Sequence, residues 1–207
     1  MIMPVLPKAR GLLFIVSGPA GSGKTTLCNR LLSAFAPCLD RVVTATTRPS
    51  RKGEHQGVDY HFLTAAEFDE NIRDSAFYEH ALVHGQRYGV LKSEVIPKLA
   101  RGLDLTLNVD VQGAAAFRKA AEGDDLLRQS LITLFLMPSD LKVIQQRLEG
   151  RGTDENTEIE RRLKVAEEEI KRWREYDYCL VSGDKDTDFA KAKAIYEAEK
   201  LRVARLS

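Results

Sequence analysis

Apolar residues gather in four short, nearly continuous runs along the chain, at residues 12–17, 103–111, 131–137 and 178–182. A strand with one face in water alternates apolar and polar residues, whereas a strand covered on both faces of a parallel sheet is apolar throughout. The short length of these runs also suits strands better than helices. The pattern therefore predicts four buried strands of one parallel sheet.

Helical periodicity follows three of these runs. After the first, third and fourth run, apolar residues recur every three or four positions, which indicates helices with one apolar face. The stripes comprise Leu27, Leu31 and Phe35, then Leu141, Ile144 and Leu148, and finally Phe189, Ala192 and Ile195. A repeated strand–helix alternation predicts the α/β class with a doubly wound parallel sheet flanked by helices.

Two stretches interrupt this alternation. Residues 44–96 are polar and rich in turn residues, and a capping box from Thr64 to Glu67 predicts a short helix between two period-2 runs. We expect a small α+β insertion with an antiparallel sheet there. Charged residues dominate positions 140–176, where a narrow apolar stripe from Ile159 to Trp173 predicts a long helix with a solvated face.

The composition is that of an ordinary globular enzyme. The 207 residues are 43% hydrophobic and 29% charged, with a formal net charge of +1. This balance predicts one domain with insertions, and it provides no uniform basic field for binding nucleic acid or a membrane. The three cysteines lack metal-ligand spacing and are expected to be reduced thiols of a cytoplasmic protein. The apolar run before Gly18 is too short for a signal peptide or a membrane span.

The segment GPAGSGKT stands between the first apolar run and the first helical stripe, and it fits the phosphate-loop (P-loop) pattern GxxxxGK[ST]. Its glycines let backbone N–H groups turn towards phosphate oxygens, and the helix start adds its dipole. Lys24 is expected to bridge the β- and γ-phosphates, and Thr25 to offer a hydroxyl to Mg²⁺. The expected triphosphate-binding residues are Gly18, Pro19, Ala20, Gly21, Ser22, Gly23, Lys24, Thr25 and Thr26.

A phosphate loop indicates a ligand but not a reaction. A GTPase should also carry an NKxD-type motif for its base, and the sequence has none. Four further segments follow the loop in order: TATTRPSRKGEHQGVDYHF, FYEHALVHGQRYGV, LNVDVQGA and RLEGRGTDENTEIERRL. Together with GPAGSGKTT they make the chain, from about Gly11 to about Glu199, resemble the guanylate kinase family.

This resemblance implies a reaction and a division of the chain. The reaction is the ATP-dependent phosphorylation of GMP to GDP in purine nucleotide metabolism, with Mg²⁺ as cofactor and dGMP as a second candidate acceptor. The implied parts are a P-loop core at residues 1–43, 97–138 and 177–207, a GMP-binding subdomain at 44–96, and a lid with its return helix at 139–176.

The resemblance assigns the GMP phosphate to four residues of the insertion, Arg48, Arg51, Tyr60 and Tyr88. The chemistry agrees, because planar guanidinium groups bind phosphate bidentately and phenol hydroxyls add donors. Exposed arginines and packed tyrosines without a ligand are the alternative interpretation.

Glu79 stands where family members read guanine. One carboxylate can accept both the N1–H and the N2–H₂ of guanine, whereas adenine presents an acceptor at N1 and is rejected. Thr44 and Asp110 complete the implied GMP site, and Asp110 also faces the metal region. An exposed strand carboxylate for Glu79 and a helix cap for Asp110 are the alternatives.

The lid region carries the remaining implied catalytic residues. Arg147, Arg151 and Arg162 match family arginines that place positive charge around the transferring phosphoryl group, and Arg161 is a rival for the last of these. With them, Lys24 and Arg48 complete the predicted catalytic set. The chain departs from the family at three positions, which are Val90 for a hydroxyl residue, Asn108 for an aspartate and Ser182 for an asparagine.

Two other functions fit parts of this pattern. A non-catalytic relative that binds phosphorylated peptides would carry a degenerate phosphate loop, whereas Lys24 and the three loop glycines are intact. A related P-loop kinase with another small acceptor would lack the arginine, tyrosine and glutamate set of the insertion. The sequence leaves the oligomeric state open.

Overall fold

The computed structural model describes residues 10–83, 85–149 and 156–205. Its larger sheet has the order β2-β7-β1-β8-β9, and every neighbouring pair is parallel. The strands are β1 (Leu13–Ser17), β2 (Leu39–Arg41), β7 (Asp104–Asn108), β8 (Leu131–Pro138) and β9 (Tyr178–Ser182). The order reverses around β1, and open α/β sheets bind ligands beyond the carboxyl ends of their strands at such a point.

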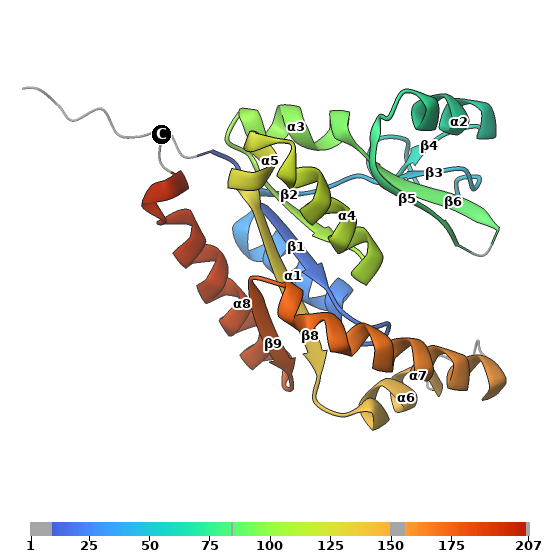
Figure 1. Cartoon of the computed structure of the whole chain (residues 1–207), viewed down its shortest axis with the longest axis vertical. Coiled ribbons are helices and arrows are strands. Elements are labelled where there is room, and N and C mark those ends of the chain that lie inside the picture. The colour runs from blue at the N-terminus through green and yellow to red at the C-terminus, as the bar shows by residue number, and fades with distance from the viewer. Residues whose placement is uncertain (1–9, 84, 150–155, 206–207) are drawn as a thin grey trace, which may run out of the picture.

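Helices cover both faces of this sheet (Figure 1). They are α1 (Lys24–Phe35), α3 (Lys92–Ala100), α4 (Val111–Glu122), α5 (Asp125–Ser130) and α8 (Lys185–Lys200). Leu13 and Ile15 of β1 pack in one core with α3, α4 and α5, whereas Phe14 and Val16 pack in a second core with α1 and α8. Successive side chains of a strand point to opposite faces, so β1 is apolar throughout because both of its faces are covered. The predicted α/β class is confirmed.

The insertion forms a second sheet of order β4-β3-β6-β5. Its elements are β3 (Ala45–Thr46), β4 (His61–Phe62), α2 (Ala65–Arg73), β5 (Phe77–Val83) and β6 (Gln86–Leu91). The predicted capping box is confirmed, since the Thr64 hydroxyl accepts the Glu67 N–H and the Glu67 carboxylate accepts the Thr64 N–H. The expected antiparallel sheet is confirmed for β3, β6 and β5, whereas β3 and β4 pair in parallel.

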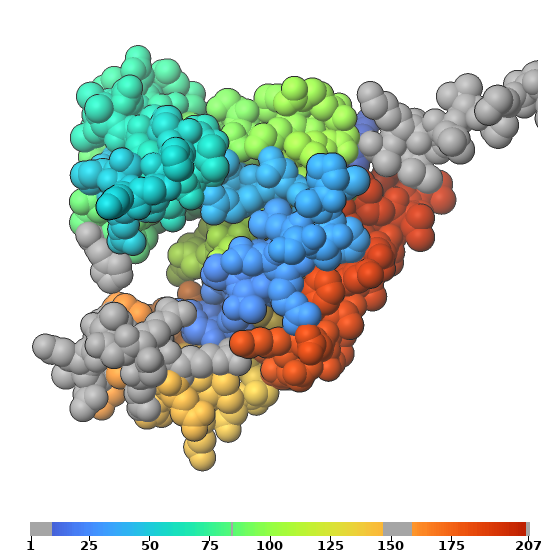
Figure 2. Space-filling view, turned by 180° about the vertical axis from the view of Figure 1, so that it is seen from behind, coloured from blue at the N-terminus to red at the C-terminus, as the bar shows by residue number. Residues whose placement is uncertain are grey.

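The charged stretch forms α6 (Leu141–Glu149), α7 (Asn156–Ile170) and the 3₁₀ turn η1 (Lys171–Glu175); a further 3₁₀ turn, η2, covers Val203–Arg205. Ile144 of α6 packs with Ile159 and Ala166 of α7 in a small core of their own, so the predicted apolar stripe joins two helices. The molecule is hollowed between these helices and the insertion (Figure 2).

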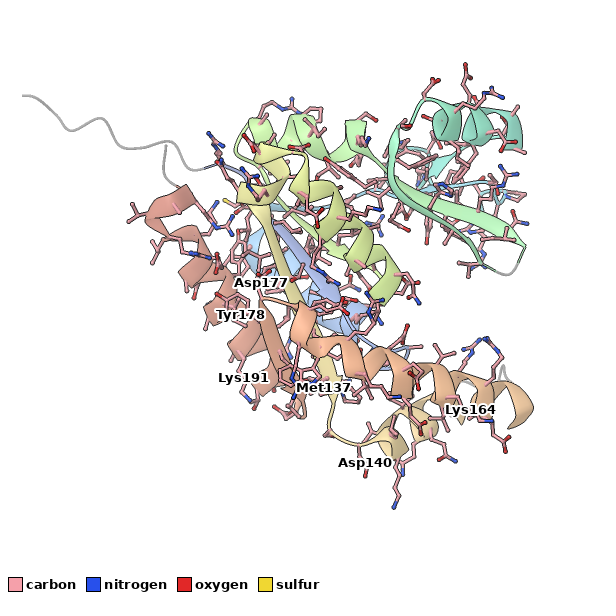
Figure 3. All side chains as sticks on the ribbon, viewed as in Figure 1. Met137, Asp140, Lys164, Asp177, Tyr178 and Lys191 are labelled. Carbon is pink, nitrogen blue, oxygen red and sulfur yellow. The ribbon has the colours of Figure 1, made fainter. Side chains whose placement is uncertain are left out.

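Side-chain contacts hold the short segment that leads from η1 into strand β9 of the larger sheet. The Tyr176 hydroxyl donates to Ser17 Oγ at 3.0 Å, and Asp177 Oδ2 accepts the N–H and the hydroxyl of Thr133, each at 2.8 Å. Asp177 and Tyr178 lie where this segment joins β9, well away from Lys164 on α7 (Figure 3). Among the described residues, no helix combines the length and the apolar character needed to span a membrane.

Three details of the predicted strands need correction. The run at 103–111 forms a strand only to Asn108, because the Asp110 side chain accepts the Gly113 N–H and begins α4. The run at 178–182 is the edge strand β9, whose Cys179 and Val181 are exposed rather than covered on both faces. The short edge strand β2 was missed because only its first residue, Leu39, is buried.

Candidate active site

The phosphate loop connects β1 to α1 as the pattern requires. Gly18 has a φ of 137°, and a Cβ at this position would lie 2.6 Å from the carbonyl oxygen of Leu136, so no larger residue fits. Gly23 is the N-cap of α1 and brings no side chain to its first N–H groups. The Lys24 ammonium group donates to the carbonyls of Gly18 at 2.7 Å and Pro19 at 2.9 Å. The loop therefore presents backbone donors and one cation to an anion.

A cavity of about 590 Å³ opens over this loop. Its wall beyond the loop comes from the carboxyl ends of the strands and from the start of α8. The lining residues are Ala20, Gly21, Ser22, Gly23, Lys24, Thr25, Thr26, Leu27, Arg30, Asn108, Leu136, Ser182, Gly183, Lys185 and Asp188. Seven of the nine predicted triphosphate-binding residues thus line one cavity, and the carbonyls of the other two, Gly18 and Pro19, hold Lys24.

The far wall of this cavity was not predicted from the sequence. Asp188, which is 8% exposed, accepts the Ser182 hydroxyl at 2.9 Å and the Gly183 N–H at 3.0 Å. Arg30 donates to the Lys185 carbonyl at 2.7 Å, and its guanidinium lies 4.6 Å from the ring centre of Phe189. Most of these groups are far from the loop in sequence, and the order of the strands together with the position of α8 brings them to it.

Thr25 and Asn108 meet at the mouth of the loop. The Asn108 amide donates to Thr25 Oγ1 at 2.9 Å, because β7 pairs directly with β1 and ends beside the first turn of α1. The position that departs from the family pattern thus contacts the hydroxyl expected to serve the metal.

Three of the four predicted phosphate-binding residues of the insertion cluster together. The Arg48 guanidinium carbon lies 4.8 Å from the ring centre of Tyr60, and the rings of Tyr60 and Tyr88 are 6.1 Å apart. Hydrogen bonds to Glu54, and lesser ones to Tyr88 and Tyr60, raise the pKa of Arg48. The structure therefore brings one cation and two phenols to one spot; we call Arg48, Tyr60 and Tyr88 the clamp.

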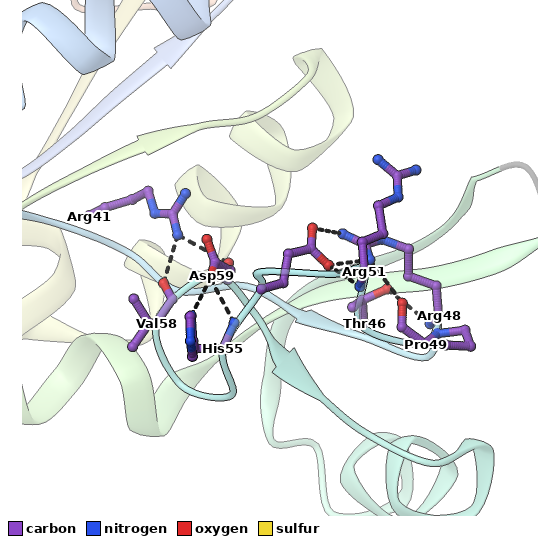
Figure 4. Close-up of polar contacts among 9 residues, drawn as sticks. Arg41, Thr46, Arg48, Pro49, Arg51, His55, Val58 and Asp59 are labelled. Carbon is purple, nitrogen blue, oxygen red and sulfur yellow. Dashed lines mark hydrogen bonds and ion pairs between the residues drawn. The ribbon is translucent and has the colours of Figure 1, made fainter.

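Glu54 is a neighbour of the clamp that was not predicted. Its carboxylate pairs with the Arg48 guanidinium at 2.6 and 2.7 Å and accepts the backbone N–H of Arg51 at 2.7 Å (Figure 4). The Arg51 side chain is exposed to solvent. The sequence pattern that could have indicated Glu54 is an acidic residue three positions after Arg51 and directly after Gly53.

Glu79 and Asp110 line one pocket of about 400 Å³ together with Tyr78, His80 and Lys92. Burial, and to a lesser extent the negative charge of Asp110, raise the pKa of Glu79 from 4.5 to about 7. Glu79 is therefore not the exposed strand carboxylate of the alternative interpretation. Asp110 caps α4, as the alternative interpretation expects, and it also lines this pocket; its role in binding GMP stays a prediction.

A smaller pocket of about 230 Å³ joins the two halves of the site. Thr25 and Asn108 line it from the phosphate-loop side, and Thr44 and Tyr60 line it from the insertion. One residue of the phosphate loop, Thr25, and one residue of the clamp, Tyr60, thus line the same pocket.

The structure describes the three predicted lid arginines to different extents. Arg162 lies on α7, Arg147 lies on α6 without a described side chain, and Arg151 lies outside the described residues. The C-terminal end of α7 approaches the site through Glu169. Burial raises the pKa of Glu169; the charge of Lys24 opposes this shift and the charge of Asp110 adds to it. Val90 is fully buried opposite Glu79 in the pairing of β5 with β6.

A parallel sheet with a phosphate loop after its central strand, together with an inserted subdomain that gathers an arginine and two tyrosines, is the arrangement of a P-loop kinase. A family model described as guanylate kinase matches residues 10–199. The chain belongs to the guanylate kinase family, and its reaction is the ATP-dependent phosphorylation of GMP to GDP.

Individual relatives agree with this assignment. A guanylate kinase of Novosphingobium aromaticivorans is 39% identical over 95% of this chain and 86% of its own length. One of Anaeromyxobacter dehalogenans is 42% identical over 94% of this chain and 83% of its own. The crystal structure of guanylate kinase from Anaplasma phagocytophilum, 28% identical, superposes with a TM-score of 0.73 and covers 97% of this chain and 92% of that one.

Proposed function

We propose that ATP binds in the 590 Å³ cavity, that GMP binds between the clamp and the Glu79 pocket, and that the γ-phosphate crosses the cleft between them. The observation that carries this proposal is the pocket shared by Thr25 of the phosphate loop and Tyr60 of the clamp. Phosphoryl transfer depends mainly on positioning and on charge stabilisation, so two anion sites facing one cleft are what the reaction requires.

On the donor side, the loop N–H groups and Lys24 hold the triphosphate. When ATP binds, the Lys24 ammonium leaves the carbonyls of Gly18 and Pro19 for the β- and γ-phosphate oxygens. On the acceptor side, Arg48, Tyr60, Tyr88 and the nearby Arg51 hold the GMP phosphate. No general base is needed, because a phosphate oxygen of GMP is already anionic at neutral pH.

Glu79 reads the base. Its carboxylate accepts the N1–H and N2–H₂ of guanine, with Asp110 and Thr44 completing the site. The buried pocket supports this role, since a carboxylate that is poorly solvated in the free protein gains more from two donors than an exposed one.

Thr25 and Asn108 are suited to Mg²⁺. This ion prefers oxygen ligands and usually binds through substrate phosphates and one or two protein groups. The Thr25 hydroxyl and the carboxamide oxygen of Asn108, whose amide nitrogen donates to Thr25 Oγ1 at 2.9 Å, offer such groups beside the loop. When bound, the metal neutralises charge on the phosphate oxygens.

We further propose that the chain is divided as its family pattern implies, with a core at 1–43, 97–138 and 177–207, the GMP subdomain at 44–96 and a lid at 139–176. α3 (Lys92–Ala100) crosses the boundary between residues 96 and 97 and connects the subdomain to the core. In this scheme Arg147, Arg151 and Arg162 bring positive charge to the transferring group when the lid closes.

An assay of ADP release tests the proposal directly. The protein is mixed with ATP, Mg²⁺ and one of GMP, dGMP, AMP, CMP or UMP, and turnover is expected with GMP well above AMP and the pyrimidine nucleotides. Comparable turnover with AMP would contradict the role of Glu79. An absence of turnover with all five, in a protein that still binds phosphorylated peptides, would favour the non-catalytic alternative.

A further inference from the structure

Glu54 holds the guanidinium of Arg48 from one defined side. Its Oε1 lies 2.6 Å from Nη2 and its Oε2 lies 2.7 Å from Nη1, so the carboxylate meets the guanidinium end-on. The Arg48 Nη1 also donates to the Pro49 carbonyl at 2.9 Å. The two side chains are only 11% and 20% exposed, so this pair is better shielded from water than a typical surface ion pair.

Glu54 is itself fixed by the backbone. Its Oε2 accepts the Arg51 N–H at 2.7 Å, and its own N–H donates to the Arg51 carbonyl at 3.0 Å across a turn that contains Gly53. The Arg48 guanidinium and the Arg51 N–H hold the pKa of Glu54 at about 2. Glu54 is therefore a charged, anchored carboxylate at any pH at which the enzyme is assayed.

This arrangement leaves one edge of Arg48 for a ligand. A guanidinium has five N–H donors, and Glu54 and Pro49 together take three of them. The remaining two, Nε–H and the second Nη2–H, form the side edge, which is the geometry for bidentate phosphate binding. Tyr60 packs against the same guanidinium, whose carbon lies 4.8 Å from the Tyr60 ring centre, and the Tyr88 ring lies 6.1 Å from that of Tyr60, so both phenols belong to the surroundings of Arg48.

We propose that Glu54 is a positioning residue for the acceptor phosphate, which keeps the side edge of Arg48 turned towards Tyr60 and Tyr88. The inference rests on the proposed function of the clamp. Glu54 stays in place when GMP binds, because the phosphate and the carboxylate use different edges of the same guanidinium. Orienting an otherwise flexible arginine in advance lowers the entropy lost on binding.

Electrostatic attraction alone would predict that the loss of the Glu54 charge improves GMP binding. Removing a negative charge beside a site for a phosphate dianion should tighten binding by simple Coulomb attraction. Glu54→Gln, which keeps the shape but loses the charge, is instead expected to raise the KM for GMP about tenfold, the effect of one lost charge-assisted hydrogen bond. The KM for ATP should not change. Glu54→Asp, which keeps the charge, should recover part of the loss.

Glu67→Gln is the matched control. It removes a carboxylate of the same subdomain that is also hydrogen-bonded, but to the N–H and the hydroxyl of Thr64 rather than to Arg48. The control is expected to leave the KM for GMP unchanged. An unchanged or lowered KM for GMP in Glu54→Gln would overturn the inference, as would an equal rise in the KM for ATP.

A double-mutant cycle with Arg48→Ala separates this inference from the proposed function. If Glu54 acts through Arg48, the double variant should bind GMP no more weakly in calorimetry than Arg48→Ala alone. Additive losses would overturn the role of Glu54 while leaving the clamp intact. An Arg48→Ala variant with wild-type GMP affinity would instead refute the clamp itself.

Discussion

Glu79→Gln should stabilise the free protein at alkaline pH while impairing recognition of GMP. The pKa of Glu79 is raised from 4.5 to about 7 by burial and by Asp110. Below about pH 4.5 the carboxyl is protonated in both the folded and the unfolded chain, and it adds no pH dependence. Between pH 4.5 and 7 the unfolded chain releases this proton while the folded chain keeps it, so stability falls as the pH rises.

The size of the effect follows from the shift. About 2.5 pH units at 1.36 kcal/mol each give a cost of roughly 3 kcal/mol for holding the charged carboxylate above pH 7. Glutamine never ionises and avoids this cost. Urea denaturation of both proteins without nucleotide should therefore show the stability of the variant, relative to wild type, growing by about 2 to 3 kcal/mol between pH 5 and pH 8.5.

The same variant should lose much of the preference for GMP over AMP in kcat/KM, because its amide cannot accept two donors as the carboxylate does. Asp110→Asn is a useful companion, since asparagine also caps helices and removes only the charge, and it should reduce the dependence of stability on pH. A stability difference between Glu79→Gln and wild type that does not change with pH would refute the reasoning about burial. Unchanged base selectivity would refute the assignment of the guanine site.

Three further variants test other parts of the site. Lys24→Ala should lower kcat at least about 100-fold with unchanged unfolding in urea, and near-normal turnover would remove Lys24 from its proposed role. Gly18→Ala should cost more than about 2 kcal/mol of unfolding free energy, because its Cβ would clash with Leu136. Gly57→Ala, with a positive φ but open space around it, should cost only about 1 kcal/mol. Equal costs would contradict the steric argument. Val90→Ser should lose about 1 to 3 kcal/mol of stability and yet lower the KM for GMP, and an unchanged KM would mean that the site has adapted around valine.

The parts of the fold that could be predicted are those with local causes. The phosphate loop is specified by its own glycines, and the central strands by being apolar on both faces. The edge strands were harder, since β2 buries a single residue and β9 exposes every second one. Asp110 was predicted as a ligand-facing group, with a helix cap as the alternative; it caps α4 because the strand ends three residues before the end of its apolar run, and it also lines the Glu79 pocket.

The site was predictable as a set of residues but not as a set of contacts. The pairing of Glu54 with Arg48 depends on a turn whose backbone direction the sequence does not reveal. The contact between Asn108 and Thr25 exists only because β7, far along the chain, pairs with β1. The sequence therefore predicted which residues should bind phosphate, while the tertiary structure decides which neighbours contact them.

The hydrogen bond between Tyr176 and Ser17 has a consequence for movement in this enzyme. Ser17 immediately precedes the phosphate loop, and Tyr176 immediately follows the turn through which α7 returns to the core. In the proposed division of the chain, this hydrogen bond joins the end of the lid to the residue that immediately precedes the phosphate loop. Lid movement and donor binding would then be coupled, and by linkage any help that the nucleotide gives to closure is matched by tighter nucleotide binding in the closed state.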